Sequence, residues 1–417
     1  MSVTCLRARW VLPIDRPPIE GGWIEIAGGR IVQVGAGRLP SGAVDLGDAA
    51  VLPGLVNAHT HVELSWLEGR VPPSASMAEW IATLIRTRRA GAAGGVDEER
   101  RLARAAAASM RDTGTVLVGD ISNSLTTPGL LVEAGLGGVV FHELLGFNAP
   151  DPVGAVRDAW TRVEQARVNL ESLSEPPGTR RNSWEPRLFF SVVAHAPYSV
   201  SPALFAAIAA RAGRGPLAIH LAESPEELEF LRTGGGPMRR LLEDVGAWNP
   251  AWTVPGCDPV QYVGDLGYLQ PGTLVVHAVH VTDAGLDRLR RSRAVIVTCP
   301  RSNLWVGAGP PRLSHFYSSG VPVAVGTDSL ASAPSLNLFD ELAEMRRLAP
   351  EVSAATLLES ATRVGAEALG CGRDFGTLGA GKRAVLARVA IPAAGMRDVE
   401  EYLVGGVPAR DIAALRP

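Results

Sequence analysis

The amino-acid sequence predicts an α/β protein, a (β/α)8 TIM-like barrel with a small β-sandwich built from both chain ends. Eight short apolar runs alternate with Ala/Leu/Arg-rich stretches of helical composition. Alternating strands and helices indicate a parallel sheet, and eight repeats over about 270 residues indicate closure into a barrel. An open doubly wound sheet is the alternative. We expect residues 51–374 to form the barrel and residues 1–50 and 375–417 to form the sandwich.

The two chain ends are predicted to consist of strands joined by turns. Strands are expected at 4–12, 22–27 and 30–34, and Gly28-Gly29 between the last two is a hairpin signal. The tail from Phe375 returns to this character, with a Gly-rich turn at 379–383 and strand-like residues at 384–390. We therefore expect the tail to pair with the N-terminal strands.

The central part of the chain is predicted to contain eight strands and several amphipathic helices. The expected strands are 51–56, 115–118, 138–141, 188–193, 216–219, 273–276, 294–297 and 321–325. The expected helices include 77–89, 98–112, 202–212, 225–231 and 338–348. Residues 171–186 are polar and Pro-rich, which predicts a mobile surface loop.

The composition narrows the class of protein. A net charge of -3 and a pI near 6.3 predict no attraction to nucleic acid or anionic membranes. No apolar run reaches the about 18 residues of a membrane span, and residues 1–7 lack the apolar segment of a secretion signal. The four cysteines form no C-x-x-C motif and suit buried thiols in a reducing compartment. We expect a cytoplasmic protein that acts on a small molecule.

Four metal-ligating side chains stand at the ends of expected strands. His59 and His61 follow the first strand, and residues two apart on a strand point to the same side. His220 follows the fifth strand and Asp328 the eighth, at the rim where barrel active sites lie. Three imidazoles and a carboxylate suit Zn²⁺ or Fe²⁺. A chance pair of solvated or core histidines is the alternative for His59 and His61 taken alone.

Further candidates lie beside these ligands. Glu223, three residues beyond His220, could pass a proton between water and substrate, or could merely supply favourable charge at a helix N-terminus. His277 follows the sixth strand and is placed to orient the water.

The remaining histidines carry weaker signals. His195 follows the fourth strand. His142 follows the third strand and His280 lies just beyond the sixth, and their roles stay open. His315 is expected on the helical side, away from the rim.

The basic residues are almost all arginines, and Lys382 is the one lysine of the chain. Some metal sites hold two ions bridged by a carbamylated lysine. Lys382 lies outside the expected barrel, so this version is excluded and we expect one ion.

Five sequence blocks together resemble the amidohydrolase superfamily. They are Pro-Gly-Leu-Val-Asn-Ala-His-Thr-His at 53–61, His-Ala-Pro-Tyr-Ser at 195–199, His-Leu-Ala-Glu at 220–223, His-Ala-Val-His at 277–280 and Gly-Thr-Asp-Ser at 326–329. More narrowly they resemble its mononuclear aminohydrolases, which include cytosine, guanine, adenosine-type and S-adenosylhomocysteine deaminases, with triazine chlorohydrolases nearby. The terminal segments resemble the family's composite β-sandwich. One departure is Gly-Lys-Arg-Ala-Val at 381–385, where the family usually has Ala-Asp after the basic pair.

The resemblance implies that His59, His61, His220 and Asp328 hold one metal ion, which brings the pKa of a water toward about 7. Because homodimers are the habit of the family, a homodimer is expected.

The resemblance also implies roles in a deamination. Asp328 would accept the proton of the attacking water, Glu223 would protonate the ring nitrogen, and His277 would steady the attacking hydroxide. A tetrahedral intermediate would then collapse and release ammonia. His195 would contact the substrate ring.

Three blocks are similar to aminodeoxyfutalosine deaminases of menaquinone biosynthesis, namely His-Val-Glu-Leu-Ser at 61–65, Cys-Pro-Arg-Ser-Asn at 299–303 and Thr-Asp-Ser-Leu-Ala-Ser at 327–332. Those enzymes convert the adenine of 6-amino-6-deoxyfutalosine, which also carries a benzoate, to hypoxanthine. Arg301 is a candidate partner of that carboxylate, with a structural ion pair as the alternative. Ser65 and Trp66 could line the pocket, Trp66 by stacking on a base, although a core tryptophan is the alternative.

The sequence thus predicts a metal-dependent hydrolytic deaminase of a 6-aminopurine nucleoside derivative, with 6-amino-6-deoxyfutalosine as the preferred substrate. The second hypothesis is a chlorohydrolase, or a deaminase of another N-heterocycle such as guanine, cytosine or a triazine. The third is a non-catalytic metal-binding scaffold, against which Glu223 and His277 together argue.

Overall fold

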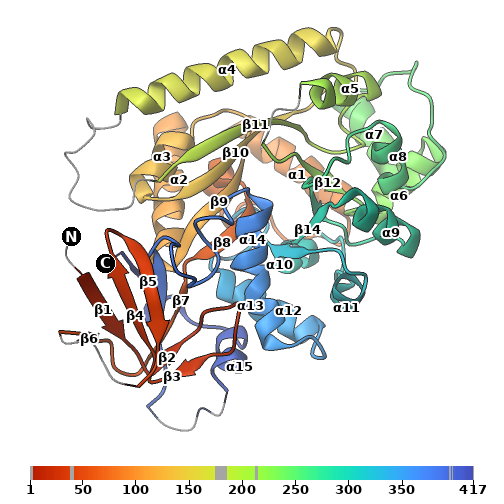
Figure 1. Ribbon diagram of the computed structural model, residues 1–417. Helices are drawn as coiled ribbons and strands as arrows, with labels where there is room; N and C mark the ends of the chain where they lie inside the picture. Colours follow the sequence, from red (N-terminus) through yellow and green to blue (C-terminus); the bar gives the residue numbers. More distant parts are fainter. Residues whose placement is uncertain are drawn as a thin grey trace.

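The computed structural model describes residues 3–37, 42–173, 186–211, 215–393, 396 and 398–416 of the 417-residue chain. Parallel strands surrounded by helices form its centre, and strands from both chain ends lie together at one side (Figure 1). The expected mixed α/β class is confirmed.

The parallel strands form two four-stranded sheets within the described residues. In spatial order the first contains β11 (Leu188–Ala194), β10 (Gly137–Leu144), β9 (Thr115–Ser122) and β8 (Leu55–Thr60). The second contains β12 (Ala218–Leu221), β13 (Leu274–His277), β14 (Val295–Thr298) and β15 (Val323–Val325). Each of the eight expected strand regions overlaps one of these strands. They are almost entirely buried, which explains why they read as continuous apolar runs.

The edge strands β8 and β15 of the two sheets meet at their C-terminal ends. The backbone amides of Thr327 and Asp328 both donate to the carbonyl oxygen of His59 at 3.1 Å. The buried Asn57 side chain adds two hydrogen bonds to Thr327, at 2.7 Å to its Oγ1 and 3.1 Å from its amide. These contacts fix the end of β15 against the end of β8.

The edge strands β11 and β12 also lie next to each other. The amide of His220 donates to the carbonyl oxygen of His195 at 2.9 Å. The buried Tyr268 hydroxyl bridges the same two strands, because it accepts from the Ala194 amide at 2.8 Å and donates to the Ala218 carbonyl at 3.1 Å. The two sheets therefore adjoin along both edges.

Helices cover the parallel strands on the outside (Figure 1). They are α1 (Met77–Ala90), α2 (Gly95–Asp112), α3 (Pro128–Ala134), α4 (Pro152–Leu173), α5 (Pro202–Ala210), α6 (Pro225–Thr233), α7 (Gly236–Asp244), α8 (Pro259–Asp265), α9 (Asp283–Ser292), α10 (Pro300–Trp305), α11 (Leu313–Ser318), α12 (Leu338–Leu348), α13 (Ala354–Ser360) and α14 (Arg363–Ala368). Several begin where a capping side chain precedes a proline, as at Ser201, Ser224 and Asp258.

All five expected helices are present within a few residues of their expected bounds. The long helix α4 is not among them, and its last three residues fall in the segment 171–186 that the sequence predicts as a loop. Residues 174–185 of that segment lie outside the described residues.

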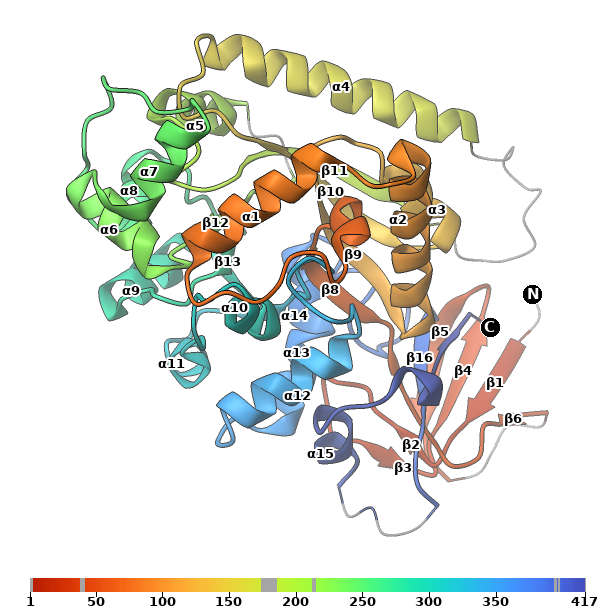
Figure 2. The same ribbon diagram turned by 180° about the vertical axis from the view of Figure 1, so that it is seen from behind.

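The segment after β8 passes over the C-terminal ends of the strands. It begins with the 3-10 helix η1 (Val62–Leu67) and leads into α1, which crosses in front of the parallel strands in Figure 2. Trp305 anchors this segment, because its Nε1 donates to the Val71 carbonyl at 3.1 Å and its carbonyl accepts from the Ser74 amide at 3.0 Å. Ser76 Oγ donates to Glu226 on α6 at 2.8 Å.

The chain ends form two further sheets. One has the order β5-β4-β1-β6, with β1 (Val3–Arg7), β4 (Trp23–Ala27), β5 (Arg30–Gly35) and β6 (Val44–Asp45). The other has the order β17-β16-β7-β2-β3, with β2 (Trp10–Val11), β3 (Ile19–Glu20), β7 (Ala49–Pro53), β16 (Leu386–Ala390) and β17 (Ile412–Leu415), while α15 (Val399–Val404) and η2 (Ala409–Asp411) lie between β16 and β17. Antiparallel pairing of β16 with β7 confirms that the tail joins the N-terminal strands.

Glycine conformation explains the predicted hairpin between β4 and β5. Gly28 and Gly29 have φ values of 57° and 70°. A two-residue hairpin turn that matches the twist of its strands requires positive φ at both positions, which glycine adopts without strain. Apolar side chains of both terminal sheets, among them Ile24, Val51 and Leu386, share one core.

Two expected strands have wrong bounds. The segment 4–12 is divided between β1 and β2, which belong to different sheets. The run 51–56 is divided at Gly54 between β7 of a terminal sheet and β8 of a parallel sheet. A Cβ on Gly54 would lie 2.2 Å from Cγ1 of Val116, so glycine lets the chain pass closely there. Both strands are buried and apolar, so periodicity alone could not separate them.

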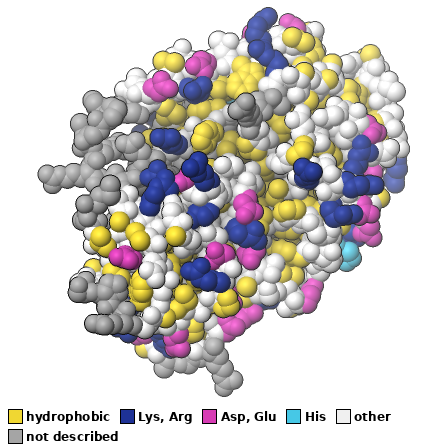
Figure 3. Space-filling view, viewed as in Figure 1, with side chains coloured by type: hydrophobic (Ala, Val, Ile, Leu, Met, Phe, Trp, Pro, Cys, Tyr) yellow, Lys and Arg dark blue, Asp and Glu magenta, His cyan; other side chains and the backbone are white. Residues whose placement is uncertain are grey.

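Charged side chains of both signs are interspersed on the face shown in Figure 3, in keeping with the small net charge. No helix in the described part of the chain has the length and apolar character of a membrane span. All four cysteines are free. Cys5 and Cys299 are buried as expected, whereas Cys257 and Cys371 are only half-buried.

The contact between β8 and β15 predicts a large effect of a single methyl group. A Cβ on Gly326 would lie 2.6 Å from the carbonyl oxygen and 2.8 Å from Cβ of His59. We expect Gly326→Ala to lower the free energy of unfolding of the metal-free protein by about 1–3 kcal/mol in urea, because the strand ends must separate.

Gly379→Ala is the matched control for this variant. Its nearest neighbour would be Thr377 Oγ1 at 3.5 Å, an ordinary contact, so its stability should change by less than about 0.5 kcal/mol. Equal stability of the two variants would contradict the tight approach at Gly326.

Candidate metal centre and active site

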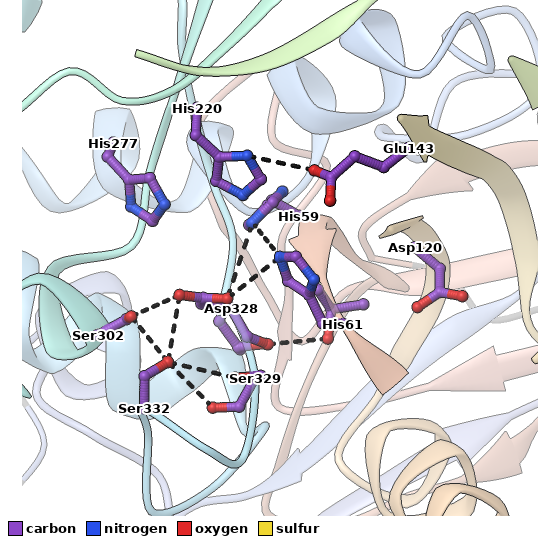
Figure 4. A network of polar contacts seen from close by, with 12 residues as sticks. His59, His61, Asp120, Glu143, His220, His277, Ser302, Asp328, Ser329 and Ser332 are labelled. Carbon is purple, nitrogen blue, oxygen red and sulfur yellow. Dashed lines mark hydrogen bonds and ion pairs between the residues drawn. The ribbon is translucent and has the colours of Figure 1, made fainter. Parts of the chain in front are cut away.

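Five potential ligand side chains converge at the C-terminal ends of β8, β12, β13 and β15 (Figure 4). His59 lies near the end of β8 and His61 directly follows it, His220 lies on β12, His277 ends β13 and Asp328 follows β15. Ligand atoms of His59, His61 and Asp328 lie within 4.8 Å of one another, as do those of His59, His220 and His277. The four predicted metal ligands are therefore brought together, with His277 beside them.

The spacing of these atoms fits one tetrahedral metal ion. His59 Nε2 and His61 Nε2 are 3.2 Å apart. Asp328 Oδ1 lies 3.5 Å from His61 Nε2 and 3.8 Å from His59 Nε2. Ligands about 2.1 Å from a tetrahedral ion are separated by about 3.4 Å, so the nitrogen and oxygen donors match Zn²⁺ or Fe²⁺.

Outer contacts orient two of the ligands toward the common space. His220 Nδ1 donates to the carbonyl oxygen of His195 at 3.0 Å and lies 3.4 Å from Glu143 Oε1, which leaves Nε2 for the cluster. Asp328 Oδ2 accepts from Ser302 Oγ at 2.6 Å and from Ser332 Oγ at 3.2 Å, which leaves Oδ1 facing the histidines. Such outer partners fix the geometry of metal ligands.

Burial keeps the imidazoles of the cluster neutral at pH 7. It lowers the pKa of His61 to about 3 and that of His220 to about 4, and nearby imidazoles act in the same direction. Burial likewise lowers the pKa of His59 and of His277 well below the ordinary value. Neutral imidazoles offer a lone pair to a metal ion, so the cluster is ready for binding without loss of protons from its histidines.

Glu223 lies at the edge of this cluster, with Oε1 at 3.4 Å from His277 Nε2. Burial, and then the charge of Asp328, raises the pKa of Glu223 well above its ordinary value. Its backbone is held by the buried Glu227, whose carboxylate accepts from the amides of Ala222 at 3.0 Å and Glu223 at 2.9 Å. A raised pKa favours the protonated carboxyl, which is the form that can donate a proton.

Backbone strain is concentrated at these strand ends. Ala222, His277, Ala278 and Asp328 have φ values of 51°, 72°, 53° and 57°, and they make up four of the seven non-glycine residues with positive φ in the described chain. Such conformations cost about 1–3 kcal/mol each and persist where surrounding contacts over-determine them. The backbone at these strand ends therefore adopts conformations that position the site residues at a cost in local stability.

The structure also brings His195 to the cluster. Its ring centroid lies 4.8 Å from that of His220, and its Nδ1 lies 2.6 Å from Ser199 Oγ, so Nε2 is free to meet a ligand. Burial, and then the charge of Arg88, lowers the pKa of His195 to about 4.

Three predicted substrate-binding residues have other partners. Ser65 Oγ donates to the Val62 carbonyl within η1 at 2.8 Å, and Trp66 is buried in the main core under Arg70. Arg301 NH1 lies 3.5 Å from both Asp340 and Glu341. This geometry matches the structural ion pair of Arg301 and the core position of Trp66 that are the alternatives, and a role of the three residues in substrate binding stays a prediction.

The other residues with open or excluded roles lie apart from the cluster. His142 Nδ1 contacts the Ser122 carbonyl at 2.9 Å, and His280 Nε2 contacts the Ala308 carbonyl at 2.8 Å. His315 is exposed on α11. Lys382 donates to the carbonyl oxygens of Gly372 and Phe375, and its own carbonyl accepts from the amide of Ile31 in β5 of a terminal sheet.

Sequence reasoning missed two buried carboxylates beside the cluster, Glu143 on β10 and Asp120 on β9 (Figure 4). Glu143 approaches His220 and accepts from Asn123 Nδ2 at 3.1 Å. The signal was available, because both stand near the ends of expected strands, as the histidines do. A single acidic residue carries no ligand spacing of its own, so the sequence does not distinguish these two from other acidic residues.

A model of the amidohydrolase family matches residues 50–409 of the chain. The chain is 33% identical over 351 residues to the aminodeoxyfutalosine deaminase of Deinococcus radiodurans, which covers 80% of this chain and 76% of that protein. It is 30% identical over 429 residues to the 5-methylthioadenosine/S-adenosylhomocysteine deaminase of Moorella thermoacetica, covering 96% of this chain and 90% of that one.

Solved structures share the fold at lower identity. Helicobacter pylori aminofutalosine deaminase in complex with methylthio-coformycin superposes with a TM-score of 0.77 at 24% identity, covering 96% of this chain and 95% of that one. Atrazine chlorohydrolase from Arthrobacter aurescens TC1, complexed with zinc, gives a TM-score of 0.75 at 22% identity, covering 99% and 92%.

The buried Asp120 predicts a pH effect on stability. Its Oδ1 accepts from the Val62 amide at 2.9 Å and its Oδ2 from Thr127 Oγ1 at 2.6 Å, yet burial raises its pKa from 3.8 to about 7. A raised pKa stabilises the fold at low pH, and this contribution is lost as the pH rises through the folded-state value.

We therefore expect the wild type to lose stability relative to Asp120→Asn as the pH rises from 5 to 7, at up to about 1.4 kcal/mol per pH unit, and the difference to level off above pH 7. Urea unfolding of both metal-free proteins at pH 5, 6, 7 and 8 measures this. A difference that is constant over the range would contradict a protonated Asp120.

Proposed function

The chain belongs to the amidohydrolase family and is a hydrolase of carbon–nitrogen bonds, and we propose that it is a metal-dependent deaminase of an adenosine-like nucleoside. The observation that carries the proposal is the cluster of His59, His61, His220 and Asp328, with the Glu223 carboxyl 3.4 Å from His277 at its edge. We propose 6-amino-6-deoxyfutalosine as the preferred substrate, supported by the 33% identity to a deaminase of that name.

We assign one divalent ion, Zn²⁺ or Fe²⁺, to His59, His61, His220 and Asp328. Such an ion, when bound, supplies a water-derived nucleophile at neutral pH. The donor spacing near 3.4 Å supports the assignment, as does zinc in the atrazine chlorohydrolase of the same fold. The remoteness of Lys382 supports a single ion.

The protein residues would divide the proton transfers of the deamination. Asp328 takes a proton from the attacking water, and the neutral carboxyl of Glu223 gives a proton to the ring nitrogen beside the amino-bearing carbon. His277 holds the attacking oxygen, and His195 contacts the ring. The carbon–oxygen bond forms, the carbon–nitrogen bond breaks, and the amino group leaves as ammonia with the proton that Asp328 has taken. The remaining proton of the attacking oxygen passes to Glu223 as the carbonyl forms, which restores the enzyme.

We further propose that the eight parallel strands close into one (β/α)8 barrel and that the terminal sheets form a composite β-sandwich. The hydrogen bonds at both edges of the two parallel sheets support closure. The shared apolar core of the terminal sheets supports the sandwich. A cytoplasmic location and a homodimer stay predictions.

A chlorohydrolase is the second candidate, favoured by the likeness to the atrazine enzyme. The same nucleophile could displace chloride from a ring carbon. Protonated Glu223 favours an amino leaving group and a basic ring nitrogen, so deamination is preferred.

The proposed function predicts ammonia release from 6-aminopurine nucleosides. Zinc- or iron-loaded protein is incubated with 6-amino-6-deoxyfutalosine, methylthioadenosine, S-adenosylhomocysteine and adenosine, and ammonia is measured. We expect the highest kcat/KM with 6-amino-6-deoxyfutalosine. Chloride release from chlorotriazines without ammonia from any aminopurine would favour the second candidate.

Replacement of Glu223 tests its role as proton donor. We expect Glu223→Gln to lower kcat by about 10²–10⁴-fold while one equivalent of metal stays bound, because Glu223 is not among the assigned ligands. Glu229→Gln on the exposed side of α6 is the matched control and should keep wild-type kcat. Unchanged turnover in Glu223→Gln would remove the assignment, and loss of metal would make Glu223 a ligand instead.

A further inference from the structure

The residues from Cys299 to Asn303 follow β14 and form the start of α10, and the proposed function assigns them no role. Its side chains point to the two ends of the active-site cluster. Ser302 and Asn303 are fully buried, and both contact residues proposed to act in the reaction.

Asn303 is held firmly in the first turns of α10. Its backbone amide donates to the Cys299 carbonyl at 3.0 Å, and its carbonyl accepts from the amide of Ala308 at 2.9 Å. Its side-chain Nδ2 then lies 2.9 Å from Nδ1 of His277. The fixed backbone aims the amide at the imidazole.

This contact determines which nitrogen of His277 carries the proton. A neutral imidazole has one donor and one acceptor nitrogen, and Nδ2 of an asparagine can only donate. Nδ1 therefore accepts, and the proton lies on Nε2. Nε2 faces the cluster, 3.4 Å from Oε1 of Glu223.

Ser302, one residue earlier, acts on the opposite side of the cluster. Its Oγ donates to Oδ2 of Asp328 at 2.6 Å and lies 2.9 Å from Ser332 Oγ, which also contacts Oδ2 (Figure 4). The outer carboxylate oxygen is thereby occupied, and Oδ1 turns toward His59 and His61.

We propose that the first turn of α10 is an alignment element, in which Asn303 fixes His277 in the Nε2-protonated form and Ser302 fixes the carboxylate of Asp328. Asn303 and Ser302 are positioning residues, since they act through His277 and Asp328. His277 then meets the attacking oxygen as a hydrogen-bond donor and not as a base. The inference rests on the proposed function only for the identity of that oxygen.

The protonation state of His277 is measurable without substrate. Metal-free protein is labelled with ¹⁵N in its histidine rings, and long-range ¹H–¹⁵N correlation distinguishes a protonated Nε2 from a protonated Nδ1. The signals of His277 are assigned by their loss in His277→Gln. We expect a protonated Nε2 and a bare Nδ1 in the wild type. A protonated Nδ1, which arises if the amide oxygen of Asn303 faces the ring, would overturn the proposal without any variant of α10.

Two neighbouring variants separate the two contacts. The ionised carboxylate of Asn303→Asp can only accept a hydrogen bond, so we expect a proton on Nδ1 of His277. We expect kcat to be about 100-fold lower and KM to change by less than about threefold. Ser302→Ala should leave the His277 signals unchanged and weaken zinc binding by about 10- to 100-fold, measured by competition with a chromophoric chelator.

The pattern across both variants decides the outcome. Persistence of a bare Nδ1 on His277 in Asn303→Asp, or the same loss of zinc affinity in both variants, would show a general packing effect and contradict the proposal. If no aminopurine is deaminated, the ring signals and zinc affinities still test the alignment element, so its failure and that of the proposed function are distinguishable.

Discussion

The contact between the ends of β8 and β15 is the constraint on which the site depends. Two amides following β15 donate to the His59 carbonyl, and the Asn57 side chain binds Thr327 from the same strand end. Gly326 has no side chain because the His59 backbone occupies that space. Since His59, His61 and Asp328 all stem from this junction, the backbone pairing that joins the two sheets also sets the distances between three of the proposed ligands.

Burial shifts the pKa values of the site residues, and hydrogen bonds on the outer side of the site offset the cost of burying these polar groups. Burial lowers the pKa of His59 among the other histidines, and burial together with the charge of Asp328 raises the pKa of Glu223. Polar groups in such a place are costly without partners, and His220, Asp328 and His277 each have one on the outer side. The His195 carbonyl serves His220, and Ser302 and Asn303 serve Asp328 and His277. The inward atoms are left for metal and substrate.

Much of the fold and the site could be predicted from particular residues. Strand positions were readable because buried parallel strands form short apolar runs, and His59, His61, His220 and Asp328 stand directly at their ends. Other elements had no such signal. The sequence of helix α4 has no marked apolar pattern that would distinguish it. The run 51–56 is divided at Gly54 because the chain passes close to Val116 there, and the spacing of apolar residues does not reveal this approach.

The sequence by itself determined the residue types and their order along the strands, which was enough to predict the α/β class, the ligand set and the hydrolase family. Only the tertiary structure decided which side chains face the cluster and which are engaged elsewhere. Arg301 lies beside Ser302 in α10 yet is paired with Asp340 and Glu341, whereas Asn303 of the same helix and Glu143 of β10 contact His277 and His220. The physical reason is that the alternation of residues along a strand sets the direction of neighbouring side chains. Partners that are far apart in sequence come into contact only when the sheets and helices pack together.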